Sequence, residues 1–206
     1  MKIQIKAMAA ALFLLLAAEG FGQQNIKTVF KSQPYSSGGY GAITNKFTRI
    51  RGEYANMVGI YGGWFVGHRL LIGAGAAAVT NNLPVPDNFS TDPLRNKSYE
   101  YGQVGAILEY VPLSEKAIHP VFHLFSGAGF SLQYERYDWH DTAPVSDENW
   151  FFVLEPGIQL EMNLLKWMRF SPGISYRASF GSNGRGLKDK DISDISYNVT
   201  LKFGKF

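Results

Sequence analysis

Long segments in which every second side chain is apolar constrain this chain more than any other feature. In residues 169–180 the apolar side chains Phe170, Ile174 and Tyr176 alternate with small or polar ones. Residues 120–134, 150–162 and 195–203 show the same alternation. A period of two, rather than 3.6, predicts β-strands with one apolar and one polar face.

Four further segments alternate more weakly, which brings the expected number of strands to eight. The predicted strands are 38–47, 53–65, 70–80, 99–111, 120–134, 150–162, 169–180 and 195–203. Short connections alternate with long polar ones at 81–98, 135–149 and 181–194, and the short first connection at 48–52 is the exception. Short turns at one end and long loops at the other predict an up-and-down antiparallel β-barrel.

The N-terminus has the order of charges and apolar residues that is typical of an export signal. Lys2 and Lys6 precede an unbroken apolar run over 7–18, and small residues follow it. The run is too short for a membrane-spanning helix, which needs ~20 residues. We therefore predict a signal peptide over 1–22, an irregular lead-in over 23–37 and a single barrel over 38–206.

The apolar faces of such a barrel point either outward to lipid or inward to a ligand, as in a secreted lipocalin-like binder. The less apolar faces are rich in Gly, Ser and Ala rather than in charges, which indicates a confined interior. The strands also match the ~9–11 residues of a tilted transmembrane strand. Aromatic residues such as Tyr54, Trp64 and Trp150 lie near the ends of the apolar faces, as in interfacial girdles. These features favour a transmembrane barrel.

Composition excludes several other classes. The chain has no cysteine, so it has neither a disulfide framework nor a thiolate site. Only 18% of the residues are charged, the formal net charge is +3, and we find no cluster of Lys and Arg interleaved with aromatic residues. Nucleic acid is therefore not an expected partner.

The export signal, the eight amphipathic strands and a last strand that ends SYNVTLKFGKF resemble the small outer-membrane barrels of Gram-negative bacteria, the OmpA/OmpX-like class. The resemblance implies a monomer in the outer membrane, in contact with lipid and lipopolysaccharide, with both termini and the short turns in the periplasm. It also implies a C-terminal aromatic signal for the barrel-assembly machinery and periplasmic chaperones. Phe206 has the opposite parity to Phe203, so either the last strand contains a bulge or Phe203 is that aromatic residue.

Charged residues on the inner face predict a polar network that fills the lumen, because eight strands enclose just enough space for their own side chains. When each hairpin is folded about its turn, three pairs lie opposite each other. These expected pairs are Glu161 with Arg169, Glu155 with Arg177, and Glu109 with His123. A buried carboxylate needs such a partner. A selective ion or proton path through the network is the alternative.

No residue of the chain is assigned a catalytic, metal-binding or cofactor-binding role. Some barrels of this size modify lipid A with Ser, His and an acid, but His123 and Ser126 differ in parity and cannot share a proton. His140, with Asp141 and Ser146, lies on a loop, while His68 and His119 are placed in turns. The loop 135–149 is acidic, and we expect a solvated loop there because no calcium-binding spacing is present; a bound divalent cation is the alternative.

The expected function is a structural or surface-interaction role. The wall is committed to lipid, so the loops 81–98, 135–149 and 181–194 are the parts free to recognise a ligand. The segment 181–186 reads as a flexible loop tip. A narrow channel or transport accessory is the first alternative, and a lipid A-modifying enzyme is the next.

Overall fold

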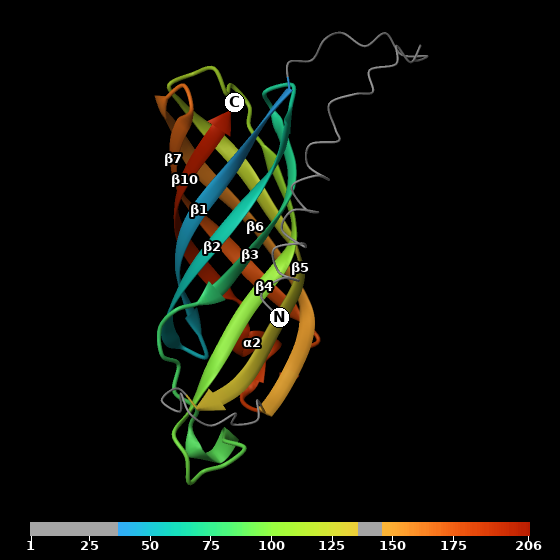
Figure 1. Cartoon of the computed structure of the whole chain (residues 1–206). Helices are drawn as coiled ribbons and strands as arrows, with labels where there is room; N and C mark the ends of the chain where they lie inside the picture. The colour runs from blue at the N-terminus through green and yellow to red at the C-terminus, as the bar shows by residue number, and fades with distance from the viewer. Residues whose placement is uncertain (1–36, 136–145) are drawn as a thin grey trace, which may run out of the picture. The chain divides into compact units, whose positions relative to one another are not determined.

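The computed structural model describes residues 37–135 and 146–206, which form a closed antiparallel β-barrel (Figure 1). Around the barrel the strands follow the order β1-β10-β7-β6-β5-β4-β3-β2, so every strand pairs with its neighbours in sequence and β10 closes the barrel on β1. The eight barrel strands are β1 (Ser37–Ile50), β2 (Glu53–Val66), β3 (Leu70–Val79), β4 (Lys97–Tyr110), β5 (Ile118–Glu135), β6 (Ser146–Leu165), β7 (Met168–Phe180) and β10 (Asp194–Lys205). The predicted fold class and number of strands are confirmed.

The two ends of the barrel differ in their connections. At one end, the turn end, lie the short connections 67–69, 111–117 and 166–167 together with Ser37 and Lys205. At the other, the loop end, lie the long connections 80–96 and 181–193. The prediction that short and long connections alternate between the ends is therefore confirmed.

The short first connection lies at the loop end and is a two-residue turn. Arg51 and Gly52 both have positive φ, 58° and 79°. A hairpin turn with two such residues matches the twist of the flanking strands, which explains why β1 and β2 stay paired to their last residues, Ile50 with Glu53.

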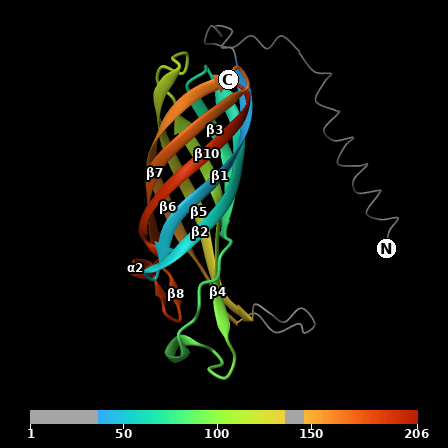
Figure 2. The ribbon, with the colours of Figure 1, turned by 90° about the vertical axis from the view of Figure 1, so that its left-hand side faces the viewer.

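The strands have unequal lengths at the loop end. β3 has 10 residues, whereas β5 has 18 and β6 has 20. In Figures 1 and 2, β4, β5 and β6 extend beyond β1, β2 and β3 at this end. β6 begins at Ser146, so the sequence was wrong to place 146–149 in a loop. Residues 1–36 lie outside the described part, and the predicted signal peptide and lead-in stay predictions.

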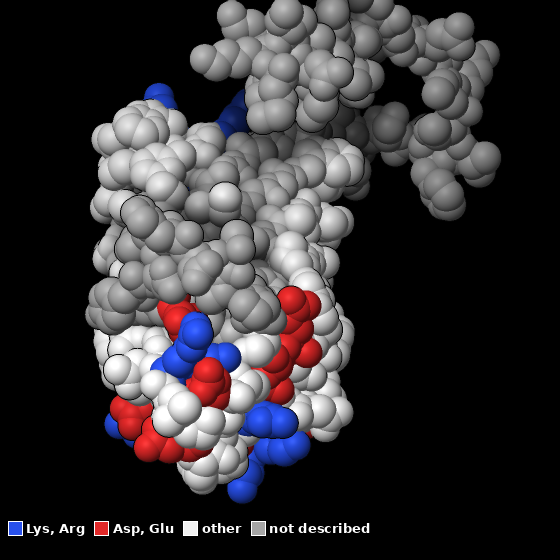
Figure 3. Space-filling model, turned by 60° about the horizontal axis from the view of Figure 1, so that its bottom comes forward, with Lys and Arg blue, Asp and Glu red and all other residues white. Residues whose placement is uncertain are grey.

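The outer wall is apolar, whereas buried charged and polar side chains share the lumen with a cluster of apolar ones. Outward side chains such as Ile60 (64% exposed) and Trp64 (59%) contrast with lumen side chains such as Glu109 and Lys202, both 0% exposed. Because this orientation is the reverse of that in a secreted barrel with an apolar interior, the lipocalin-like alternative is wrong. Charged side chains gather at the loop end, below a largely uncharged wall (Figure 3).

Three short elements lie in the long connections. They are the 3-10 helix η2 (Asp87–Phe89), the small hairpin of β8 (Asn183–Gly184) and β9 (Leu187–Lys188), and the helix α2 (Asp189–Ile192). Among the described residues, no helix is both long and apolar enough to cross a membrane.

Candidate functional site

The first cluster of charged side chains lies in the half of the lumen nearer the turn end and centres on Glu109. Glu109 pairs with His123 in the register of β4 and β5 and contacts its Nδ1 at 2.9 Å. It also accepts hydrogen bonds from the hydroxyls of Tyr61, at 2.8 Å, and Tyr40, and from Lys202 Nζ at 2.8 Å. The expected contact between Glu109 and His123 is present, but the sequence missed the other three partners.

Lys202 connects this centre to a second carboxylate, Glu161. Its Nζ lies 2.7 Å from Glu161 Oε2, while Arg169 approaches Oε1 at 2.6 Å. His119 Nε2 contacts the same carboxylate at 3.0 Å, and the Ser171 hydroxyl donates to it at 2.9 Å. The expected neighbours Glu161 and Arg169 therefore meet. His119 lies in β5 and is 1% exposed, so its placement in a turn was wrong.

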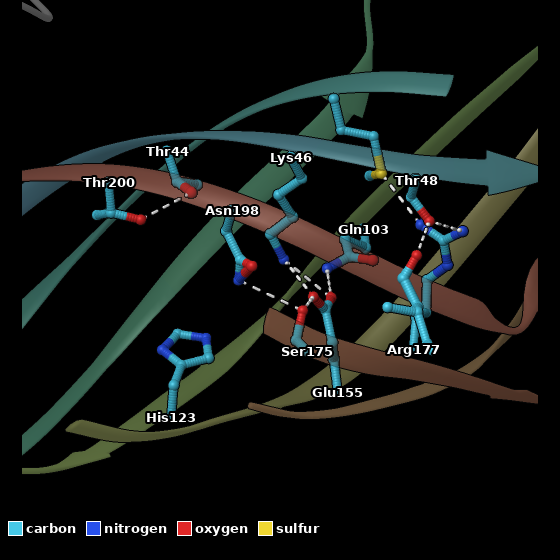
Figure 4. A network of polar contacts seen from close by, with 12 residues as sticks. Thr44, Lys46, Thr48, Gln103, His123, Glu155, Ser175, Arg177, Asn198 and Thr200 are labelled. Carbon is cyan, nitrogen blue, oxygen red and sulfur yellow. Dashed lines mark hydrogen bonds and ion pairs between the residues drawn. The ribbon is translucent and has the colours of Figure 1, made fainter. Parts of the chain in front are cut away.

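The second charged cluster, shown in Figure 4, centres on Glu155 of β6. Lys46 of β1 reaches across the lumen and donates to both carboxylate oxygens, at 2.8 and 2.9 Å. Ser175 and Gln103 donate to the same carboxylate at 2.6 and 2.9 Å. Glu155 lies opposite Arg177 in the register of β6 and β7, as the sequence predicted, since Leu154 pairs with Ala178 and Gly157 with Ser175. The expected ion pair between them is wrong, because Lys46 binds the carboxylate and Arg177 turns toward the loop end.

Arg177 is a buried cation that is held by backbone oxygens and soft groups instead of a carboxylate. It is 0% exposed and donates to the carbonyl oxygens of Ile192, at 2.9 Å, and Arg49, at 3.0 Å. Its guanidinium also contacts Met57 Sδ at 3.1 Å and lies 5.0 Å from the centre of the Tyr101 ring. Carbonyl dipoles and an aromatic face replace part of the water that the cation loses on burial.

Residues 181–193, which we call the loop-end cap, are folded onto the barrel. Leu187 and Ile192 are 1% and 0% exposed. The Asp189 carboxylate accepts backbone hydrogen bonds from Gly181 and Ser182, at 3.1 and 2.7 Å. The segment 181–186, for which the sequence predicted a flexible loop tip, forms part of the β8-β9 hairpin, and its backbone donates hydrogen bonds to Asp189 and Asp147.

The connection 80–96 packs beside the cap. Its side chains Leu83 and Val85 are 2% and 9% exposed. Arg51 joins the two segments, since its Nη1 donates to Gly186 at 2.7 Å while its guanidinium lies 4.3 Å from the centre of the Phe89 ring. The described loops are therefore packed against each other rather than separately solvated.

At the turn end, the two C-terminal aromatic residues point in different directions. Phe203 stacks with Trp167 at 6.2 Å on the outer wall. The Phe206 ring instead packs against Tyr40, at 4.9 Å, and beneath the guanidinium of Arg169, at 3.9 Å. The parity difference thus has a structural consequence, because Phe206 turns inward over the charged cluster. The role of either residue in assembly stays a prediction.

Between the two charged clusters the lumen contains a cavity of about 20 Å³, with Lys46, Gln103, His123 and Gln159 in its lining. A single water needs roughly 10–15 Å³ of such space. The side chains therefore fill the lumen at this level. A wider depression of about 940 Å³ at the turn end, lined by Arg69 and Lys166 among others, stops at Arg169 and Phe206.

The other sequence candidates are dispersed. His123 is buried in the lumen, whereas Ser126 has outward parity. His140 and Asp141 fall in 136–145, outside the described residues. Ser146 contacts the Thr91 hydroxyl at 2.8 Å. Within the described ranges, no group of three or more His, Asp or Glu side chains is placed to hold a metal ion.

Two carboxylates of the predicted acidic loop have defined partners. Glu135 forms an ion pair with Arg95 at 2.9 Å. Asp147 accepts hydrogen bonds from the Arg185 backbone, at 2.7 Å, and from Gln133. These carboxylates connect neighbouring segments at the loop end.

The chain matches no protein-family model and no curated protein, but solved structures share its fold. Neisserial surface protein A superimposes with a TM-score of 0.56 at 10% identity, over 82% of this chain and 97% of that one. A major outer membrane protein of Thermus thermophilus gives 0.52 at 8% identity, over 81% and 98%. The attachment invasion locus protein Ail of Yersinia pestis gives 0.47 at 10% identity, over 82% and 97%. The chain therefore shares the fold of the small eight-stranded outer-membrane β-barrels.

Proposed function

We propose that this barrel is a monomeric surface-interaction or structural protein of the outer membrane that acts through its loop end. The observation that carries the proposal is that side chains fill the lumen and that both ends are covered, by Phe206 at the turn end and by the loop-end cap at the other. The outer wall is apolar. The loop end is therefore the described surface with the chemical variety needed to recognise a partner.

The filled lumen favours this function over a channel. Glu109, Glu155 and Glu161 each accept several hydrogen bonds or ion pairs from lumen side chains. An ion that passed through would have to separate these buried pairs, which costs several kcal/mol for each charge left without its partner.

We further propose that the protein is not an enzyme. The buried histidines His119 and His123 each contact a carboxylate, but both carboxylates are occupied by Lys202 as well, and Phe206 covers the cluster from the turn end. A general base needs a nucleophile and a substrate within hydrogen-bond reach. The described lumen offers no such access.

The proposed orientation places the turn end in the periplasm and the loop end outside. The chain would be exported by the segment 1–22, delivered by periplasmic chaperones and inserted by the barrel-assembly machinery. Lipopolysaccharide and other membrane lipid would then surround the wall. Trp167 and Phe203 at the turn end, and Trp150 nearer the loop end, would lie at the two interfaces.

A labelling experiment on whole cells tests this orientation, using the fact that the chain has no cysteine. Leu94 is 96% exposed in the connection 80–96, and Lys116 is exposed in a turn at the opposite end. We expect a membrane-impermeant maleimide to label Leu94→Cys in intact cells. Lys116→Cys should react only after the outer membrane is permeabilised. Labelling of Lys116→Cys alone in intact cells would overturn the proposed orientation and the role of the loop end.

A further inference from the structure

A groove of about 340 Å³ lies on the outer wall near the loop end, over the seam between β1, β2 and β10. Its lining is mostly aromatic or aliphatic: Phe47, Tyr54, Ile195 and Tyr197, with Thr48, Arg49 and Asp194. The register pairs Arg49 with Tyr54 and Phe47 with Tyr197. The groove is therefore built on hydrogen-bonded strands, whose positions are fixed.

Arg49 is unusual for its position, because it follows the outward parity of Ile43 and Phe47 and is exposed. Within the described residues its guanidinium takes part in no ion pair. Its own carbonyl accepts from Arg177, so the backbone at this point is anchored. An outward cation is costly in the hydrocarbon core but costs ~0–1 kcal/mol near the interface, where it can meet lipid phosphates.

Neighbouring residues show that this part of the wall lies at the edge of the apolar band. Asn45 and Asn56 are partly buried on the same outer face, and their side chains share a hydrogen bond of 2.7 Å. Thr80 and Asn81 extend these polar contacts across β2. Polar side chains that bond to one another mark the level at which the wall passes from acyl chains to headgroups.

We propose that this groove binds the phosphate-bearing end of a membrane lipid. Arg49 donates to the phosphate, and Phe47, Ile195 and Tyr197 pack against the first part of an acyl chain. The guanidinium fork matches phosphate geometry. The groove volume of about 340 Å³ is more than tenfold the roughly 10–15 Å³ that a single water needs, and it accommodates a phosphate with its glycerol or sugar. Asp194 also lines the groove; its Oδ1 accepts from the Ile195 backbone at 2.7 Å, and among the described residues it forms no ion pair with Arg49.

The test is a titration of folded protein in neutral maltoside micelles with short-chain phosphatidylglycerol, followed by the backbone NMR signals of residues 47–54 and 194–197. We expect saturable shifts, an affinity at least about tenfold weaker for Arg49→Gln, and partial recovery in Arg49→Lys. Arg185→Gln is the matched control, since it removes the same charge from an exposed position in the loop-end cap and should bind as the wild type does.

Two further titrations separate a lipid site from simpler alternatives. Diacylglycerol of the same chain length should bind at least tenfold more weakly, and inorganic phosphate alone should give no saturable shift. If diacylglycerol bound as tightly as phosphatidylglycerol, the proposed contact between Arg49 and the phosphate would be wrong. If inorganic phosphate bound as tightly as phosphatidylglycerol, the proposed contacts with the acyl chain would be wrong. A shift in gel mobility on heating first shows that Arg49→Gln and the wild type are both folded. Equal lipid affinity of the two folded proteins would then overturn the proposed lipid site while leaving the proposed function intact.

Discussion

The two ends of this barrel are closed in physically different ways. At the turn end, charged groups neutralise one another inside the lumen, as Glu109 and Glu161 share Lys202, and Phe206 covers them. At the loop end, the cap closes the barrel with apolar side chains, Leu187 and Ile192, and anchors itself to Arg177 through a backbone carbonyl. One closure is part of the barrel, whereas the other is a separate segment placed on it.

This difference predicts how the two regions open. The charged cluster is contributed by several strands, so it is disrupted only when the barrel itself unfolds. The loop-end cap is a continuous segment and can open locally while the barrel stays folded. A surface that recognises partners is expected to come from the less stable region, which agrees with a function located at the loop end.

The largest effect should follow the removal of Glu109. Glu109→Ala leaves Lys202, Tyr40 and Tyr61 without a shared acceptor, and breaking a buried charge pair from one side costs about 3–5 kcal/mol. The free energy of unfolding in urea, measured in lipid or detergent, checks this value. Glu115→Ala, at an exposed position in a turn, should change it by less than about 0.5 kcal/mol. Similar changes in the free energy of unfolding for Glu109→Ala and Glu115→Ala would show that the charged cluster around Glu109 does not stabilise the barrel.

The contrast between wall and lumen is tested by adjacent residues of β6. Leu154→Arg places a charge on the lipid-facing wall and should destabilise the barrel by about 2–4 kcal/mol. Val153→Arg, at a lumen position that is 0% exposed, should instead crowd the interior and reduce the yield of folded barrel. Measurements of refolding yield and of unfolding in urea distinguish the two variants. If the barrel tolerated Leu154→Arg and Val153→Arg equally well, the assignment of Leu154 to the wall and Val153 to the lumen would be wrong.

A smaller, local effect is expected in the cap. Ile192→Ala removes a buried side chain, and about 2 kcal/mol of local stability should be lost. Hydrogen exchange at the amides of Ser182 and Ser193, both hydrogen-bonded to Asp189, should accelerate roughly 30-fold, while amides in β2 stay protected. Leu94→Ala is the exposed control. Equal acceleration in β2 would mean that the cap and the barrel unfold together.

The smallest effect should come from an exposed ion pair at the same end. Arg95 contacts Glu135 at 2.9 Å, but its side chain is 55% exposed. Arg95→Gln should cost about 0.2–1 kcal/mol at low salt and close to nothing at about 1 M salt. Paired unfolding curves at the two salt concentrations measure it. A loss of several kcal/mol in the free energy of unfolding that did not depend on salt would show that the Arg95–Glu135 pair contributes as much as the buried ion pairs do.

The sequence predicted the strands and their facing well, because alternation in 150–162 and 169–180 reports burial directly. It also brought Glu161 near Arg169, although the register pairs Arg169 with Asn163 and the contact with Glu161 is diagonal. It could not find Lys46 for Glu155 or Lys202 for Glu109, because these side chains meet across the lumen from strands that are not adjacent. The cap was missed because 181–193 has no hydrophobic period, and its fold depends on contacts with Arg51 and Arg177.

Conductance measured across a planar lipid bilayer tests the central claim most directly, namely that this is a membrane barrel with a filled and doubly closed lumen. The protein is first shown to be folded by its shift in gel mobility on heating. The folded protein should then insert without producing discrete conductance steps. Reproducible steps from folded protein would contradict a lumen blocked by Glu109, Glu155 and Glu161 and their partners, and would favour a channel.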